Sequence, residues 1–502
     1  MSSEKSYGQI LKASSIMGGA AGINLLLGML RVKLAAVFIG TTGVGLISSF
    51  GSLQGLVGTL AGLGLQSSAV REIAAAVGKS DDQAIGRTVL TLRRMCWLTG
   101  LVGMVLMMLL APWLSQLTFG HRDYMFDIAA LGVIILFGNL SGGQMALIQG
   151  MRRIGDMARA NIFGAVAGTV AAIGFYAALG LRGIIPTLLT VSALQLALSW
   201  FFARRVPVPK VDLTLLQTFS EANSMVRLGL VMMWNGLMAS AVAYFTVTLI
   251  TQYEGIQAVG LYSAAFALSG MFVSFVLGAM GADYYPRLTG VAYDKPAMMR
   301  MVNEQTEIGL LLALPGLLAT LALAPWILEI FYTREFSGAV EMLQWFILGC
   351  LGRVISWPLG YVMLALGKGR WFLVTETSFN LLHVVLVALG LQFYGIEGVA
   401  IAFVVMYVCY TAAVLFVSHR LIGFRWSPEC TRLGLLSLSM HAMLFVASHL
   451  LPLWPATWFG LSLTFITCVL CLRGLVARVG AEHRILCAII RLPGGKLLLH
   501  AH

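Results

Sequence analysis

Two long apolar runs lie next to each other in this sequence: WFLVTETSFNLLHVVLVALGLQF (residues 371–393) and IEGVAIAFVVMYVCYTAAVLFVSH (residues 396–419). A bilayer core about 30 Å thick requires a helix of about 20 apolar residues, and each run is long enough to supply one. Similar runs follow one another along the chain with short polar breaks. They are too long and too continuously apolar for the strands of a membrane barrel. The sequence therefore predicts an all-α, polytopic membrane protein.

The composition of the 502 residues agrees with this prediction. Hydrophobic residues make up 59% and charged residues 11%, with a mean hydropathy of +0.88, whereas a soluble domain carries roughly 25% charged residues. The net charge of +12 is spread beside the ends of the apolar runs and not along one stripe. This distribution disfavours nucleic-acid binding and favours contact with anionic lipids.

The polar breaks divide the chain into about fourteen expected transmembrane helices. Their expected ranges are 10–38, 43–70, 88–111, 125–149, 158–180, 183–203, 223–252, 256–284, 301–325, 340–366, 371–393, 396–419, 433–451 and 456–476. With a cytoplasmic N-terminus, every even-numbered connection is cytoplasmic and basic. On the periplasmic side, the connections contain only three basic residues, Arg122, Arg182 and Arg334. The positive-inside rule therefore predicts a bacterial inner-membrane protein with both termini in the cytoplasm.

The two halves of the sequence repeat each other. Gly45-Leu46-Ile47-Ser48 matches Gly260-Leu261-Tyr262-Ser263, and further matches join 62–71 to 278–287, 150–153 to 367–370, and Gly183-Ile184 to Gly398-Val399. All four matches have nearly the same offset in sequence number, and an offset that spans six helices predicts two parallel repeats around a central cavity. The expected parts are an N-lobe (1–203), a cytoplasmic linker (204–222), a C-lobe (223–420), and two extra helices with a basic tail (421–502).

Charged side chains at membrane depth are costly and are therefore candidates for function. Arg31 lies in the first expected helix and Arg353 in the tenth. One guanidinium from each lobe would suit a diphosphate, because its planar fork of donors matches phosphate oxygens. An ion pair between Arg353 and Glu376 is the alternative. Lys33 either joins the cations or snorkels to the headgroups, and Glu376 is also a candidate for ion coupling.

Uncharged polar residues in the expected helices offer a second kind of site. Asn235, Tyr244 and Trp357 would suit an oligosaccharide if they face the cavity, because amides hydrogen-bond to sugars and aromatic faces stack on them. No nucleotide-binding loop, HExxH pattern or large outer loop occurs. Cys468 and Cys471 form a CxxC pattern inside an apolar run, where small packing residues are the simpler interpretation. We therefore expect a transporter and not an enzyme, without a metal ion or other cofactor.

Two segments resemble a known family. LRVKLAAVFIGTTGVGLISSFGSLQGLVGTLAGLGLQSSAVREIA, from Leu30 to Ala74, resembles the first two helices of Wzx-type polysaccharide flippases, which belong to the superfamily that also contains MurJ and the MATE exporters. FSGAVEMLQWFILGCLGRVISWPLGYVMLALGKGRWFLVTETSFN, from Phe336 to Asn380, is similar to helices 10 and 11 of the same family, especially the members that flip enterobacterial common antigen or O-antigen units. The likeness extends over about residues 8–420.

The resemblance implies twelve core helices in two lobes around a cationic cavity, with alternating access. It implies that the substrate is an undecaprenyl-diphosphate-linked oligosaccharide, turned from the cytoplasmic to the periplasmic leaflet for surface polysaccharide assembly. Arg31 matches the cation of the family's first helix and Arg353 that of its tenth. A polysaccharide polymerase and a chain-length regulator are candidate partners.

The two extra C-terminal helices depart from the twelve-helix members of the family. This departure keeps a MurJ-like lipid II flippase open as an alternative. A MATE-like cation antiporter is disfavoured, because cations and not carboxylates predominate at membrane depth. A membrane-embedded polymerase or ligase would need a larger outer loop than the one expected around residues 111–124.

Overall fold

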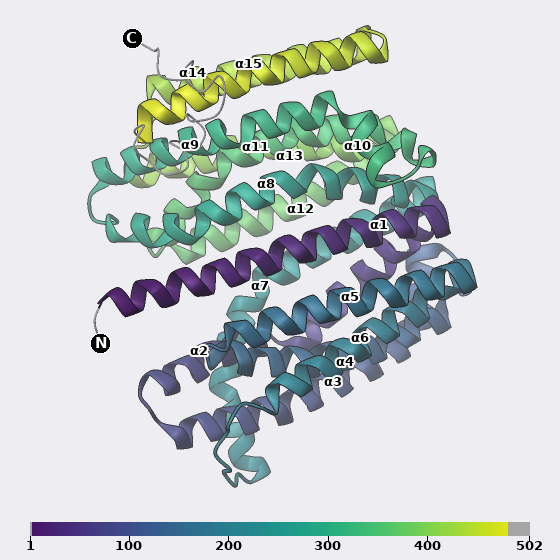
Figure 1. The fold of residues 1–502 in the computed structure, drawn as a ribbon, viewed down its shortest axis with the longest axis vertical. Coiled ribbons are helices and arrows are strands. Elements are labelled where there is room, and N and C mark those ends of the chain that lie inside the picture. The colour runs from purple at the N-terminus through teal and green to yellow at the C-terminus, as the bar shows by residue number, and fades with distance from the viewer. Residues whose placement is uncertain (1–2, 480–502) are drawn as a thin grey trace. The chain divides into compact units, whose positions relative to one another are not determined.

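The protein forms two compact units of helices in a computed structural model that describes residues 3–479. Unit 1 extends to Gly260 and includes Phe331–Thr333; unit 2 contains Leu261–Ile330 and the chain from Arg334 onward. The helices of unit 1, labelled in Figure 1, are α1 (Ser3–Gly62), α2 (Leu65–Gly78), α3 (Asp82–Phe119), α4 (Met125–Gly150), α5 (Ile154–Leu179), the 3-10 helix η1 (Gly180–Gly183), α6 (Ile184–Ala203) and α7 (Leu215–Glu254).

Unit 2 begins within α8 (Ile256–Gly290), which starts at the end of unit 1. Its other helices are α9 (Lys295–Ala322), α10 (Ala324–Phe331), the 3-10 helix η2 (Arg334–Ala339), α11 (Val340–Ala365), α12 (Gly369–Tyr394), α13 (Glu397–Ile422), α14 (Pro428–Leu450) and α15 (Leu453–Val479). The predicted basic tail beyond residue 479 lies outside the described residues.

Within the described residues, twelve helical stretches are long and apolar enough to cross a membrane. Two of them, Ala21–Gly62 and Ile154–Ala203, contain 42 and 50 residues, and at about 1.5 Å per residue each would exceed a hydrocarbon core of about 30 Å. Both are interrupted, the first by non-helical angles at Gly40 (φ 61°, ψ −165°) and the second by Gly180–Gly183. Each therefore provides two spans, and the fourteen predicted helices are all present.

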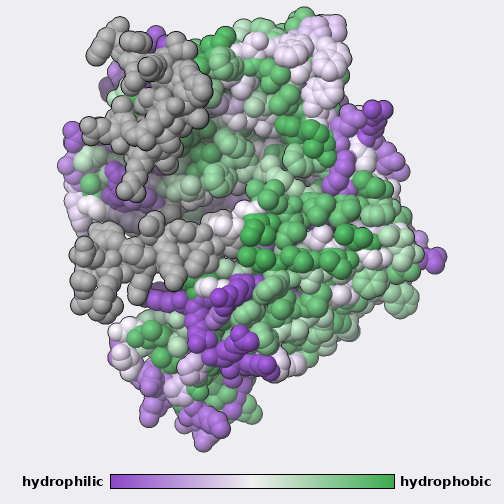
Figure 2. All heavy atoms as spheres, in the orientation of Figure 1, coloured by the Kyte–Doolittle hydropathy of each residue, from purple (hydrophilic) through white to green (hydrophobic). Residues whose placement is uncertain are grey.

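The surface carries the apolar residues that a bilayer requires. Large side chains such as Leu109, Val170, Phe275 and Val374 are mostly exposed, and Figure 2 shows hydrophobic residues over much of the visible face. In water such a surface would drive association. In a bilayer it faces hydrocarbon, so the chain is a multi-pass membrane protein.

Breaks in the backbone recur at the predicted spacing of the repeat. Gly40 and Gly255, which are as far apart in sequence as Gly45 and Gly260, have φ of 61° and 85° where one helix ends and the next begins. Gly180 and Gly395 have the same separation, have φ of 57° and 59°, and end α5 and α12. Glycine adopts such angles at little cost because it has no Cβ. The repeat predicted from sequence matches is therefore present in local backbone geometry.

One match of the predicted repeat is corrected by the structure. The sequence match of 150–153 with 367–370 pairs Gly150 with Gly367. In the structure, Arg152 (φ 55°) corresponds to Gly367 (φ 67°), because both occupy the left-handed position of the same turn. Their amides donate to the carbonyls of Gln149 and Leu364, and this pair has the same separation in sequence as Gly45 and Gly260. The two copies of this turn are therefore aligned by their backbone conformation, which pairs Arg152 with Gly367, and not by the identity of their Gly and Arg residues.

Close backbone contacts also recur in unit 1, where the two repeats begin their second helices. A Cβ added to Gly45 would lie 2.1 Å from the carbonyl oxygen of Ile256, and one added to Gly260 would lie 2.1 Å from that of Thr41. Each residue of one contact corresponds to a residue of the other at the offset of the repeat. Glycine is required at both places because any side chain would collide with backbone.

Two pairs of helices also have their backbones in close contact at a glycine. In unit 1, a Cβ on Gly183 would lie 2.4 Å from the Phe175 carbonyl oxygen, between α5 and the start of α6. In unit 2, a Cβ on Gly398 would lie 2.0 Å from the Gly390 carbonyl oxygen, between α12 and α13. Small residues allow such close helix packing inside a membrane.

The contacts of α7 and of the last two helices bear on the predicted parts. α7 packs against α1, α2 and α3 and therefore belongs to unit 1, although the sequence places this helix at the start of the C-lobe. α14 and α15 pack on α9, and the Arg478 guanidinium of α15 binds the Glu307 carboxylate of α9 at 2.8 Å. The limits at 203, 222 and 420 remain predictions.

Candidate functional site

Arg31 lies in the first half of α1, where this helix packs against α5. Its guanidinium Nη2 donates a hydrogen bond to the Ala165 carbonyl oxygen at 3.0 Å, and a Cβ on Gly168 would lie 3.0 Å from the same nitrogen. Among the described residues no carboxylate pairs with Arg31, and its buried Nε has no hydrogen-bond partner. Asn24, two turns earlier on α1, also has a buried oxygen, Oδ1, without a partner. Unsatisfied buried polar atoms are rare in native proteins and call for an explanation.

Lys33 is held differently. Its ammonium donates a hydrogen bond to the backbone carbonyl oxygen of Tyr332, which belongs to unit 1 although it is remote in sequence. This contact fixes the cation within the protein. Whether Lys33 joins the other cations or snorkels to the headgroups stays a prediction.

Arg353 lies in the middle of α11 in unit 2 and is partly exposed. Among the described residues its guanidinium forms no ion pair and no hydrogen bond. The ion pair with Glu376, which was the alternative to a diphosphate role, is not formed. The Glu376 carboxylate, on α12, instead accepts a hydrogen bond from the Tyr410 hydroxyl of α13 at 2.6 Å, because α12 packs mainly against α13.

The three residues expected to bind sugar have different surroundings. Trp357 is partly exposed and packs in an aromatic cluster with Tyr284 and Tyr361, at ring-centroid distances of 5.7 and 4.8 Å. Asn235 is exposed on α7. Tyr244 is 2% exposed, and its hydroxyl lies 3.1 Å from the Thr118 hydroxyl of α3. Tyr244 therefore offers no open ring face to a sugar, and its geometry favours a packing role.

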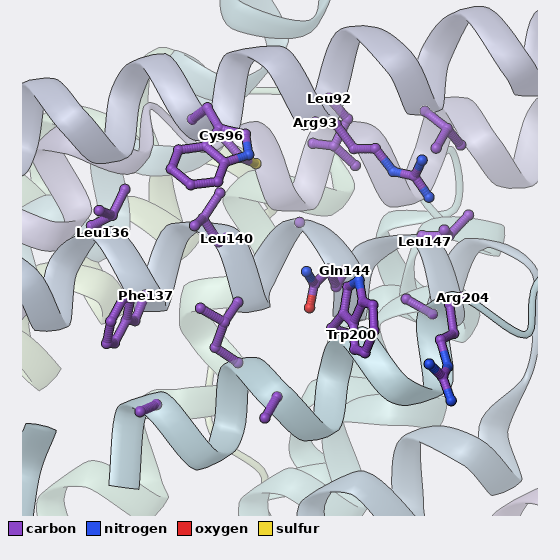
Figure 3. Close-up of a pocket in the computed structure, with 17 residues that line it drawn as sticks. Leu92, Arg93, Cys96, Leu136, Phe137, Leu140, Gln144, Leu147, Trp200 and Arg204 are labelled. Atoms are coloured by element: carbon purple, nitrogen blue, oxygen red, sulfur yellow. The ribbon is translucent and has the colours of Figure 1, made fainter. Parts of the chain in front are cut away.

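A pocket of about 890 Å³ lies among α3, α4 and α6 of unit 1. Figure 3 shows Arg93 of α3 and Arg204, directly after α6, at one end of the pocket, and Leu136 and Phe137 of α4 at the other. The remaining lining residues are almost all apolar: Val89, Leu92, Cys96, Trp97, Leu140, Gly143, Gln144, Leu147, Ala193, Leu196, Ala197, Trp200 and Ala203. The sequence assigned both arginines to the lipid-facing cations and gave no sign that they share a pocket.

A second group that the sequence did not indicate lies in unit 2. His449, in the last turn of α14, has its Nε2 3.6 Å from Oε1 of Glu341 in the first turn of α11. His449 and Glu341 line a pocket of about 540 Å³, and Glu397, in the first turn of α13, lines it too. Acids in first turns and histidines in last turns are ordinary helix-end residues, so none of the three is distinctive in sequence.

Solved structures with the same fold include transporters of two kinds. A MATE-family multidrug resistance transporter of the MOP superfamily, in an inward-facing conformation, matches with a TM-score of 0.68 and 15% identity over 80% of this chain and 94% of its own. The lipid II flippase MurJ, in an inward closed conformation, matches with a TM-score of 0.68 and 12% identity over 93% of this chain and 99% of its own. At these identities the matches show the fold alone.

Curated relatives match most of the sequence. The lipid III flippases of Escherichia coli (strain K12) and Shigella flexneri are each 24% identical over 419 residues, which is 80% of this chain and 96% of theirs. A family model described as "Polysaccharide biosynthesis protein" matches residues 44–341, more than half of the chain. The chain therefore belongs to the polysaccharide biosynthesis protein family.

Proposed function

We propose that this protein flips an undecaprenyl-diphosphate-linked oligosaccharide from the cytoplasmic to the periplasmic leaflet of the inner membrane by alternating access. The observation that carries the proposal is that neither Arg31 nor Arg353 is neutralised by a carboxylate among the described residues. An uncompensated guanidinium at membrane depth is expensive. An anionic ligand would offset that cost, and the oxygens of a diphosphate match the planar donors of a guanidinium. The likeness to the lipid III flippases supports a lipid-linked sugar.

In this proposal one diphosphate site is open alternately to the cytoplasm and to the periplasm. Arg31 contributes one guanidinium and Arg353 the other. Lys33 adds positive charge near Arg31. Asn235 and Trp357 are the candidates for contact with the sugar, and the polyprenyl tail stays in lipid. Glu376 remains the candidate for ion coupling, with Tyr410 orienting its carboxylate.

The test is transbilayer movement of a fluorescent undecaprenyl-diphosphate oligosaccharide in proteoliposomes. Arg31→Ala and Arg353→Ala should each abolish movement, and Arg31→Lys should retain part of it, because an ammonium keeps the charge but not the fork. Arg182→Ala is the matched control, since Arg182 is exposed in η1. Full movement in both Ala variants, with folding intact, would contradict the diphosphate role.

Lipid II is the second candidate substrate. The match to MurJ covers 93% of this chain, whereas the MATE match covers 80%, and the larger coverage supports a fourteen-helix architecture of the MurJ kind. The same proteoliposomes should therefore be loaded with labelled lipid II in a parallel arm. Faster movement of lipid II than of the oligosaccharide lipid would replace the first substrate by the second. Exchange of organic cations for protons or sodium, without movement of either lipid, would reject both.

A further inference from the structure

The pocket among α3, α4 and α6 combines two uncompensated cations with walls of hydrocarbon. Neither Arg93 nor Arg204 forms an ion pair with a described carboxylate, and no residue that lines the pocket is acidic. Asp156, in the first turn of α5, is already bound by Arg153 and Arg159, at 3.6 and 3.5 Å. One end of the pocket is therefore complementary in charge to an anion.

The rest of the pocket has almost nothing to offer a polar molecule. Gln144 is the only amide among its lining residues, and its Oε1 already accepts a hydrogen bond from the Ser199 hydroxyl at 2.6 Å. The other walls are aliphatic and aromatic side chains, among which Trp97 and Trp200 are 53% and 54% exposed. Such walls suit acyl chains and exclude a sugar, which would find no partners for its hydroxyls.

The two ends of the pocket also lie at the depths in the membrane that the headgroup and the acyl chains of a lipid would occupy. Arg93 is in the first third of α3 and Arg204 directly follows α6, at the side that the charge pattern predicts to be cytoplasmic. The Arg204 guanidinium lies 4.7 Å from the ring centroid of Trp200, and tryptophan is enriched at the membrane–water interface. The cations are therefore at headgroup level, and Leu136 and Phe137 at the opposite end reach toward the hydrocarbon.

We propose that this pocket is a binding site for an anionic glycerophospholipid of the cytoplasmic leaflet, with its phosphate on Arg93 and Arg204 and its acyl chains along α4. A resident phospholipid fits better than the transported lipid. All walls come from unit 1, whereas alternating access carries a substrate between lobes. The bound lipid fills the space between α3 and α6 and stabilises their packing on α4. The site is independent of the proposed transport function.

The test uses the detergent-purified full chain, native mass spectrometry and thermal unfolding. Dioleoyl phosphatidylglycerol is titrated against phosphatidylcholine with the same acyl chains. Arg93→Gln/Arg204→Gln removes both cations. Arg87→Gln/Arg205→Gln is the matched control, because it removes two exposed charges from the same ends of the same helices without touching the pocket. Ala197→Trp keeps the charges and fills the pocket.

We expect one phosphatidylglycerol to remain bound to the wild type and to raise its unfolding temperature more than phosphatidylcholine does. The Arg93→Gln/Arg204→Gln variant should bind phosphatidylglycerol about thirtyfold more weakly, since one basic residue near an anionic headgroup contributes about a fivefold gain. Ala197→Trp should also lose the lipid, and the control should keep it. Equal binding by the pocket variants and the control would overturn the proposal, as would equal binding of the two phospholipids. Displacement of phosphatidylglycerol by undecaprenyl phosphate at equal concentration would overturn it in favour of the transported lipid.

Discussion

The hydroxyl of Tyr410 donates a hydrogen bond to the Glu376 carboxylate, across 2.6 Å from α13 to α12. Both groups lie on membrane-spanning helices and are partly buried. We predict that Tyr410→Phe lowers the free energy of unfolding by about 1–3 kcal/mol, because it leaves the carboxylate without its donor. Tyr394→Phe, which alters an exposed tyrosine at the end of α12, should have no effect. Chemical denaturation in detergent compares the two, and equal stability of both variants would contradict the role of this bond.

The same pair allows a test of ion coupling. Glu376→Gln keeps an acceptor for Tyr410 but removes the charge and the titratable proton. If Glu376 couples transport to protons, the variant should fold normally and move substrate at the same rate with and without a pH gradient. Proteoliposomes with an imposed gradient measure this. A gradient response equal to that of the wild type would exclude Glu376 from coupling.

Gly168 provides a test of how the position of Arg31 affects transport. A Cβ at this position would lie 3.0 Å from the Arg31 Nη2 and 3.2 Å from a methyl group of Val191, so Gly168→Ala should displace the guanidinium by a few tenths of an ångström. We expect movement of the lipid-linked sugar to fall by about tenfold, because small misplacements of a binding group are costly. Gly174→Ala, also on α5, meets nothing within 4 Å and should transport normally. If the two variants have the same rate, the exact position of Arg31 is not limiting.

The contact between Gly390 and Gly398 should be intolerant of any side chain. Gly398→Ala places a Cβ 2.0 Å from backbone, which cannot move aside as a flexible side chain can. We expect the free energy of unfolding to fall by about 1–3 kcal/mol or more, and Gly183→Ala should produce a similar loss in unit 1. Gly434→Ala on α14 has open space around it and serves as the control. Thermal unfolding monitored by tryptophan fluorescence provides the comparison, and a wild-type midpoint for Gly398→Ala would disprove the tight contact.

Glu72 on α2 should make stability depend on pH. Burial raises the pKa of this carboxyl and Glu221 raises it further, whereas the Ser224 hydroxyl, 3.2 Å away, and Arg71 act in the opposite direction. A pKa that is higher in the folded than in the unfolded protein favours folding at low pH and loses that contribution as pH rises through the folded value. Glu72→Gln should therefore raise the unfolding temperature at pH 8 but not near about pH 4, where the unfolded carboxyl is largely protonated. An equal gain at both values would mean that charge is not the cause.

Much of this fold follows from the sequence, because a bilayer imposes simple rules on it. The length and spacing of apolar runs predicted the helices, including both pairs that continue into each other at Gly40 and at Gly180–Gly183. The repeat was also visible, since glycine is needed wherever backbone contacts backbone, as at Gly45 and Gly260. The turn at Arg152 and Gly367 was misaligned because a left-handed conformation there does not demand the same residue in both copies.

The surroundings of individual side chains were harder to predict. A helix that is apolar on all sides has no periodicity to show which face meets a neighbour. The sequence therefore could not distinguish the buried Tyr244 from the exposed Asn235 on the same helix. It could not show that Glu376 faces Tyr410 and not Arg353. Nor could the sequence show that Arg93 and Arg204 line one pocket, since that depends on how α3 and α6 pack on α4.

The reciprocal contact at Gly45 and Gly260 has the form of a homodimer interface. Residue Thr41 meets Gly260, and their counterparts Ile256 and Gly45 meet in return, which is the pattern that a two-fold axis produces when identical subunits associate. Here both partners belong to one chain. The same steric requirement for a residue without a side chain is therefore met twice within one chain, once at Gly45 and once at Gly260.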